Sequence, residues 1–284
     1  MQINPVIEKE LKTKMRGWRA PALITAYLGF LFFVVFIYFL IYQENRRYGS
    51  QVLIPEIVVS LYNTIAFIQL LLILFITPII TGGAISSERE RQTLDLLLCT
   101  DFSALKIIIG KIFVSIAHIM LLVTASFPIL GIVFLYGGVR IWDVILLFIF
   151  YIIIAVMTAS IGVFYSTVFK KSIVSIVMTY LTLGFFIVGT AIALLIYSEL
   201  ILDYLYRLNW YDIMFFLTPN PFYGFGIVIE DTLTDYGLLD LFVEAAIYRG
   251  GVPVITALGA NSIFNIALSI CLIMLSARRL RRLK

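Results

Sequence analysis

Six long apolar stretches without a single charged residue constrain this 284-residue sequence more than any other feature. They cover residues 20–42, 57–81, 112–136, 144–169, 173–197 and 253–277, and each is 23 to 26 residues long. A helix of about 20 apolar residues crosses the hydrocarbon core of a bilayer, which is about 30 Å thick. The sequence therefore predicts six transmembrane helices, each with some length to spare for tilt.

The overall composition supports a membrane protein. Hydrophobic residues make up 62% of the chain and charged residues only 13%, whereas soluble domains carry about 25% charged residues. Two cysteines and one histidine exclude a disulfide framework and a zinc site built on paired Cys and His. The predicted fold class is thus an all-α polytopic membrane protein.

The positions of the Lys and Arg residues predict the orientation of the spans. Sixteen of the 21 basic residues lie in alternate segments: residues 1–19, 82–111, 170–171 and 278–284. Cytoplasmic segments retain such an excess, so both termini are expected in the cytoplasm. Two termini on the same side require an even number of spans, in agreement with the six predicted. The basic tail suits anionic lipid headgroups, and no soluble basic domain is present that would bind nucleic acid.

Residues 4–19 have the pattern of a short amphipathic helix. Its apolar face has Ile7, Leu11, Met15 and Trp18, and its other side has Glu8, Lys12 and Arg16. We expect this helix to lie in the membrane interface with Trp18 at headgroup level. The alternative is a solvated basic leader.

The segment 82–111 between the second and third spans is the most informative loop. Gly82 and Gly83 are expected to end the second span, and Ser87 followed by Glu90 has the spacing of a capping box. The helix that this predicts would carry Leu94, Leu97 and Leu98 on one face. Such a short helix suits docking against another protein; a linker helix that touches only lipid is the alternative.

The sequence resembles the membrane subunits of ATP-binding cassette transporters of the ABC-2 type. The resemblance spans nearly the whole chain and depends on the leader at residues 4–11, the six spans, and the loop from Glu88 to Leu98 that continues to Gly110-Lys111. In that family the loop reads Glu-x-Glu-x-Gly-Thr-Leu, then a Thr-Pro-like turn, then Gly-Lys. Here Gln92 replaces the Gly and Asp101 replaces the Pro.

The resemblance implies roles for both segments. The loop would be the coupling helix that contacts a cytoplasmic ATP-binding subunit, and the matching residues are Ser87, Glu88, Glu90, Thr93, Leu94 and Leu97. The leader would be the connecting helix, with Glu8, Leu11, Lys12, Met15, Arg16 and Trp18. A second membrane subunit, identical or homologous, would complete the transporter. Mg-ATP would bind to the partner ATPase, because no Gly-x4-Gly-Lys-[Ser/Thr] motif occurs in this chain.

The segment 198–252 is predicted to face the outside and carries eight acidic residues against two Arg. Its apolar part, residues 211–229, is interrupted by Pro219 and Pro221, which disfavour a full span. We expect short re-entrant helices that dip into the outer leaflet, an element that the ABC-2 family often carries before its last span.

The spans contain few polar side chains. Of Asp, Glu, Lys, Arg and His, only His occurs in the spans, as His118. A single neutral His in a span more often forms a hydrogen bond to a neighbouring helix than takes part in catalysis. Asn261 and Asn265 share a face of the last span and predict interhelical hydrogen bonds. The pairs Ala155/Ala159 and Gly162/Ser166 are small enough for close helix packing.

These observations favour a permease subunit that exports a hydrophobic, amphipathic or peptide-like substrate with energy from a partner ATPase. No catalytic, cofactor-binding or metal-binding residue is assigned to this chain. The alternatives are a membrane-embedded enzyme acting on lipid or peptide, for which His118 would have to be catalytic, and a non-transporting assembly or sensing subunit with the same fold.

Overall fold

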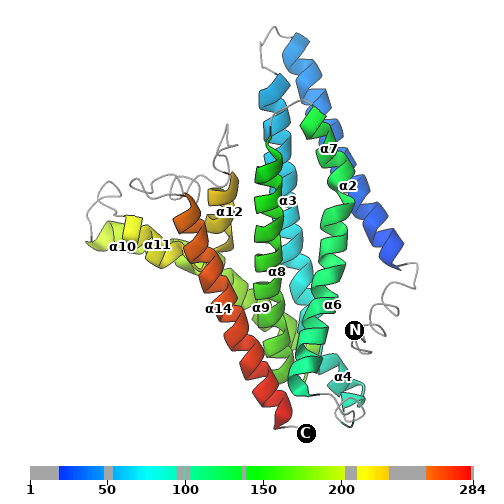
Figure 1. The fold of residues 1–284 in the computed structure, drawn as a ribbon, viewed down its shortest axis with the longest axis vertical. Helices are drawn as coiled ribbons and strands as arrows, with labels where there is room; N and C mark the ends of the chain where they lie inside the picture. Colours follow the sequence, from blue (N-terminus) through cyan, green and yellow to red (C-terminus); the bar gives the residue numbers. More distant parts are fainter. Residues whose placement is uncertain are drawn as a thin grey trace.

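A computed structural model of the chain describes residues 19–47, 54–94, 99, 103–135, 139–201, 210–229 and 254–282. Within these residues every regular element is a helix (Figure 1). The predicted helix over residues 4–19, with Glu8, Leu11, Lys12, Met15, Arg16 and Trp18, lies outside the described residues except for Arg19. Leu97 and most of the segment 202–252 also lie outside them.

In the described part of the chain, six helical segments are long and apolar enough to cross a membrane, which agrees with the predicted number. Four are continuous helices, of which the first, second and fourth spans are α2 (Arg19–Arg47), α3 (Ile54–Gly82) and α8 (Ile141–Val168). The third span consists of α6 (Ala104–Ala125) and α7 (Phe127–Leu135), and the fifth of α9 (Ser172–Gly184), the π-helical segment η1 (Phe185–Gly189) and α10 (Thr190–Ile201). The last is α14 (Val254–Arg281).

Each of these spans extends beyond its apolar stretch at one end or both, as the third and the last show. The third begins at Ala104, eight residues before the predicted boundary, with the Ser103 hydroxyl accepting a hydrogen bond from the Lys106 amide at 3.4 Å. The last continues to Arg281. Both differences arise because apolar length marks the part of a helix that fits into lipid, whereas helical hydrogen bonding continues through charged residues at the membrane surface.

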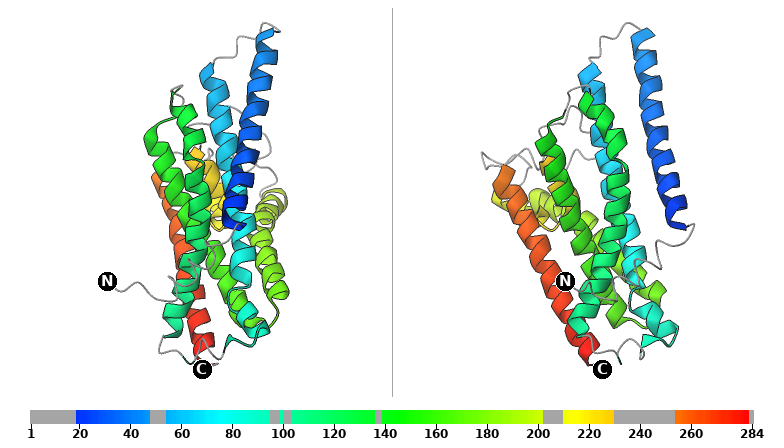
Figure 2. Two further views of the ribbon diagram at one scale, coloured as in Figure 1. Left: turned by 90° about the vertical axis from the view of Figure 1, so that its right-hand side faces the viewer. Right: turned by 45° about the vertical axis from the view of Figure 1, so that its right-hand side comes forward.

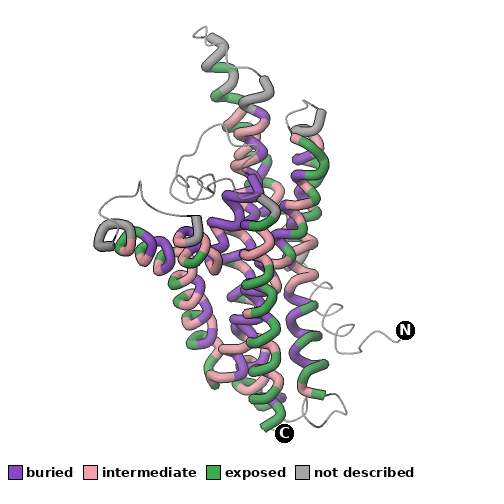
Figure 3. The backbone as a smooth tube through the Cα atoms, turned by 60° about the vertical axis from the view of Figure 1, so that its left-hand side comes forward, coloured by how far each residue is buried: buried purple, intermediate pink, exposed green. Residues whose placement is uncertain are grey.

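Helix α8 lies at the centre of the bundle and packs against α3, α6, α9 and α14, and against the short helix α12 (Pro221–Ile229). Helix α2 lies at the edge (Figure 2, right) and exposes a row of phenylalanines. Buried residues therefore concentrate on the inner helices, while the outer helices alternate between buried and exposed turns (Figure 3).

Small residues let α8 approach α3 closely, as the sequence predicts for this helix. Ala155, Ala159, Gly162 and Ser166 are all buried. A Cβ atom on Gly162 would lie 2.0 Å from Thr81 Oγ1, so Thr81 or the helix backbone would have to move. This glycine is thus required where the end of α3 crosses α8.

The apolar part of the segment before the last span forms two short helices, α11 (Trp210–Leu217) and α12 (Pro221–Ile229), instead of one continuous helix. Asn220 begins α12: its Oδ1 accepts from the Phe222 amide at 2.9 Å, and Pro221 occupies the first helical position. From Pro221 to Ile229 nearly every residue of α12 is buried, and the helix packs against α8 and α14. The prolines separate the helices as predicted; their depth in the outer leaflet remains a prediction.

A polar junction holds the α11–α12 turn in place. Asn220 Nδ2 donates to the Ile187 carbonyl of η1 and to Thr190 Oγ1, both at 2.8 Å. Asn261 of α14 donates to the Thr218 and Asn220 carbonyls at 2.7 and 3.2 Å. The predicted interhelical hydrogen bond is confirmed for Asn261, whereas Asn265 donates to Asn261 within the same helix at 3.0 Å.

Candidate functional site

The loop after the second span folds into a very short helix, α4 (Ser86–Glu90). Its end has the hydrogen bonds of a Schellman motif, because the Thr93 amide donates to the Glu88 carbonyl at 2.9 Å and the Gln92 amide to the Arg89 carbonyl at 3.1 Å. Gln92 has a φ of 57°, the left-handed conformation that favours glycine. This explains physically why glycine suits the position of Gln92 in the ABC-2 motif.

The predicted capping box is wrong. Ile85, not Ser87, precedes the first residue of α4, and the Ser87 hydroxyl donates back to the Gly83 carbonyl. The Glu90 carboxylate is engaged with Ser172 on another helix. The capping prediction fails because Ser87 is the second residue of the helix, where a hydroxyl donates a hydrogen bond to a backbone carbonyl of the preceding turn. A helix that runs unbroken from Ser87 to Leu98 is also excluded, since Gln92 ends α4.

The N-terminus of α4 is capped by a side chain from α8. Ser166 Oγ accepts hydrogen bonds from the Ile85 and Ser86 amides at 2.7 and 2.9 Å. These amides belong to the first turn, whose N–H groups have no partner within the helix. The Ser86 hydroxyl in turn donates to Ser172 Oγ at 3.1 Å. The start of α4 is thereby fixed to the fourth and fifth spans.

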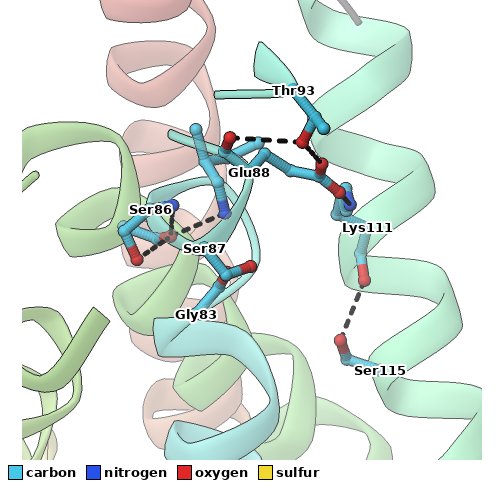
Figure 4. Close-up of polar contacts among 9 residues, drawn as sticks. Gly83, Ser86, Ser87, Glu88, Thr93, Lys111 and Ser115 are labelled. Carbon is cyan, nitrogen blue, oxygen red and sulfur yellow. Dashed lines mark hydrogen bonds and ion pairs between the residues drawn. The ribbon is translucent and has the colours of Figure 1, made fainter. Parts of the chain in front are cut away.

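Glu88 links α4 to the third span (Figure 4). Its Oε1 forms an ion pair with Lys111 Nζ at 3.2 Å, and its Oε2 accepts from Thr93 Oγ1 at 2.5 Å. Burial opposes ionisation of this carboxyl, but the Thr93 hydroxyl and the Lys111 charge outweigh burial and hold its pKa below the ordinary value. Lys111 is the residue of the Gly-Lys pair in the family motif, and this ion pair shows what it contacts.

Two further charged residues attach α4 to the turn between α8 and α9. The Glu90 carboxylate accepts from the Ser172 amide and hydroxyl at 2.9 and 2.8 Å and so caps the start of α9. The Arg89 guanidinium lies 3.5 Å from the Thr167 and Phe169 carbonyls at the end of α8. A cation beside these C-terminal carbonyls is favourable.

An apolar cluster closes the site from within the bundle. It consists of Ile85, Leu94, Ile107, Ile108, Ile112, Ala159, Val163 and Leu280. Leu94 is buried in this cluster and so does not belong to an exposed stripe. The exposed residues of the segment 83–94 are Glu90, Arg91 and Gln92.

The site therefore joins every span except the first. Contacts reach the segment 83–94 from α6, α8, α9 and the C-terminal end of α14, which carries Leu280 (Figure 1). Among the residues that the structure describes, no three His, Cys, Asp or Glu side chains gather as metal ligands. His118 lies half-buried on α6. What the arrangement provides is mechanical: a rigid element at one end of the bundle attached to several spans.

Four residues of this site are not predicted by the sequence pattern. Arg89 and Lys111 lie within the motif without a predicted role, and the pattern around Ser166 indicates a small residue but not a hydroxyl that caps another helix. Ser172 carried a weak signal, since it stands at the start of a span directly after Lys170 and Lys171. The distances along the chain between these four residues and the residues that they contact follow no regular spacing.

Fold and site together define the class of protein: a multi-pass helical membrane protein with a short polar-anchored helix between its second and third spans. Within that class, the chain belongs to the ABC-2 family of transporter membrane proteins, because the family model described as ABC-2 family transporter protein matches residues 4–275. It is thus an ABC-2 type permease subunit. Permeases of this family work with a separate ATP-binding subunit. No curated protein matches the chain in a sequence search.

Proposed function

We propose that this permease subunit exports a hydrophobic, amphipathic or peptide-like substrate across the plasma membrane. Both termini face the cytoplasm, where the segment 83–94 contacts the ATP-binding subunit that binds Mg-ATP. Two permease subunits, identical or homologous, form the substrate path between them, and the helix at residues 4–19 lies along the inner membrane surface among the lipids. The absence of charge from all six apolar stretches supports an apolar or amphipathic cargo over an inorganic ion.

One observation carries this proposal: the attachment of α4 to other spans by hydrogen bonds and an ion pair. Ser166 and Ser172 connect it to the fourth and fifth spans, and Lys111 connects it to the third. A partner that displaces α4 therefore acts directly on these spans. Closure of an ATPase pair is a displacement of this kind.

The experiment is co-purification followed by reconstitution. The chain is isolated from its native membrane, the co-purifying ATP-binding subunit is identified, and ATP hydrolysis is measured in proteoliposomes with and without the permease. We expect replacement of residues 87–92 by a Gly/Ser linker to abolish stimulation of ATP hydrolysis. Trp142→Ala is the matched control, since Trp142 is 70% exposed at the first turn of α8, far along the chain from α4. Undiminished association and stimulation after the replacement would overturn the coupling assignment.

Direction and cargo need a flux measurement. Fluorescent lipid and peptide probes are added outside one set of inside-out vesicles that contain the complete complex and are sealed inside a second set. ATP-driven movement into or out of the lumen is then followed. Export predicts ATP-dependent accumulation of an amphipathic probe and none of a small inorganic ion. ATP-dependent loss from the lumen would reverse the proposed direction.

A further inference from the structure

The turn at residues 169–171, between α8 and α9, lies directly against α4. Glu90 on α4 accepts from both the amide and the hydroxyl of Ser172, and Arg89 faces the Phe169 carbonyl at 3.5 Å. The turn therefore cannot shift relative to α4 without losing these contacts. Two loops that are about 80 residues apart in the chain form one rigid surface.

This surface is basic. Lys170 and Lys171 are exposed on the turn, and Arg91 is exposed beside them at the end of α4. Among the described residues of this surface, Glu90 has the one exposed carboxylate, and it already accepts two hydrogen bonds from Ser172. These bonds, together with the charges of Lys171 and Arg91, hold the pKa of Glu90 below the ordinary value. We call Arg91, Lys170 and Lys171 the basic rim.

We propose that the basic rim is a docking surface for an acidic face of the ATP-binding subunit, so that the turn at residues 169–171 contacts the partner alongside α4. This proposal rests on the proposed function. It differs from it in adding the second loop, which the sequence motif does not include. Exposed charges of one sign at the edge of an interface raise the association rate and set the register of the two surfaces.

Charge and geometry favour a protein over lipid as the occupant of the rim. Anionic headgroups need only a positive potential and tolerate any arrangement of the cations. Here the three cations come from two loops whose relative position is fixed by Ser172, Glu90 and Arg89. A fixed arrangement is useful only against a partner with a fixed arrangement of its own.

The test reverses the charge of the rim. Wild type and Lys170→Glu/Lys171→Glu are placed in nanodiscs of neutral phosphatidylcholine, and their affinity for the purified ATP-binding subunit that co-purifies with the wild type is measured at low and high salt. The matched control is Arg278→Glu/Arg279→Glu, which makes the same charge change on exposed residues at the same end of the bundle. Lys170→Arg/Lys171→Arg keeps the charge.

We expect the rim reversal to weaken binding at low salt by about tenfold or more and to flatten its salt dependence. The α14 control and the arginine variant should stay within about threefold of wild type. Equal affinity of the rim reversal and the wild type would overturn the docking surface and leave the proposed function intact. An effect that appears only in nanodiscs with phosphatidylglycerol would assign the rim to lipid and also overturn the proposal. Failure of the wild type itself to bind any ATP-binding subunit would refute the proposed function, and the docking surface with it.

Discussion

The ion pair between Glu88 and Lys111 is the contact between α4 and the third span whose strength is easiest to predict. We consider Glu88→Gln, Lys111→Met and the double variant. Glu88→Gln keeps the length of the side chain, Lys111→Met shortens it by one atom, and each removes one charge. The double variant removes both charges and leaves no ion without its partner.

The structure gives the size of the effect. At a separation of 3.2 Å and an effective dielectric constant of about 20, two unit charges attract by about 5 kcal/mol. The Lys111 side chain is 8% exposed and that of Glu88 30% exposed, so the cost of removing both from water offsets a large part of this attraction. We expect a net coupling free energy of about 1–3 kcal/mol between the two residues.

The assay is a double-mutant cycle on thermal unfolding of the purified chain in one detergent. Each single variant should unfold at a lower temperature, with Glu88→Gln the more destabilised of the two because Lys111 is the less exposed partner. The double variant should be more stable than the sum of the single losses predicts. Additive losses would show that the pair contributes no coupling and would refute the reasoning.

The pH dependence provides an independent check on the same pair. The folded-state pKa of Glu88 lies below its ordinary value of 4.5. Its stabilising contribution is therefore fully present above that value and is lost as the pH falls through the lower, folded-state pKa. Wild type should lose stability in acid more steeply than Glu88→Gln, which has no carboxyl to protonate; parallel acid profiles would contradict the assignment.

Three further predictions concern stability in detergent. Gln92→Gly should stabilise the chain by about 0.5–1 kcal/mol, because φ is 57° there, whereas Arg91→Gly, with φ at −84°, should not. Gly162→Ala should cost about 3 kcal/mol or prevent folding, since its Cβ would lie 2.0 Å from Thr81 Oγ1; an unchanged melting temperature would contradict this packing. Asn261→Ala should cost about 1–2 kcal/mol by leaving two carbonyls of the α11–α12 turn without their donor. The control is Ser160→Ala, because the buried Ser160 hydroxyl donates only within α8, to the Val156 carbonyl at 2.7 Å; a loss for Asn261→Ala no larger than that of the control would contradict the prediction.

The number of spans was predictable because it depends on a local property. An apolar stretch of 23 residues or more forms a helix in lipid whatever its neighbours are, since every backbone group must bond within the segment. The helix ends were less predictable. Ser126 and η1 divide the third and fifth spans, and neither stretch carries a charge that marks the interruption.

The position of α4 was predictable and its attachments were not. The glycines at its start and the charged run mark a short element after the second span. Ser87 and Glu90, however, have the same spacing whether they cap α4 or serve other partners. Which of these occurs is decided by Ser166 and Ser172, about 80 residues away, and a single sequence does not show that these residues meet.

The attachments of α4 differ in kind, and the difference has a mechanical consequence. To α8 and α9 it is joined by hydrogen bonds at both of its ends, through Ser166 at the start and Glu90 at the finish. To α6 it is joined by the ion pair of Glu88 together with the apolar packing of Ile85. Directional bonds at two points fix both the position and the angle of a helix, whereas one ion pair and an apolar contact permit rotation and sliding. If a partner displaces α4, the fourth and fifth spans must follow it as one unit, and the adjustment must occur at its boundary with the third span.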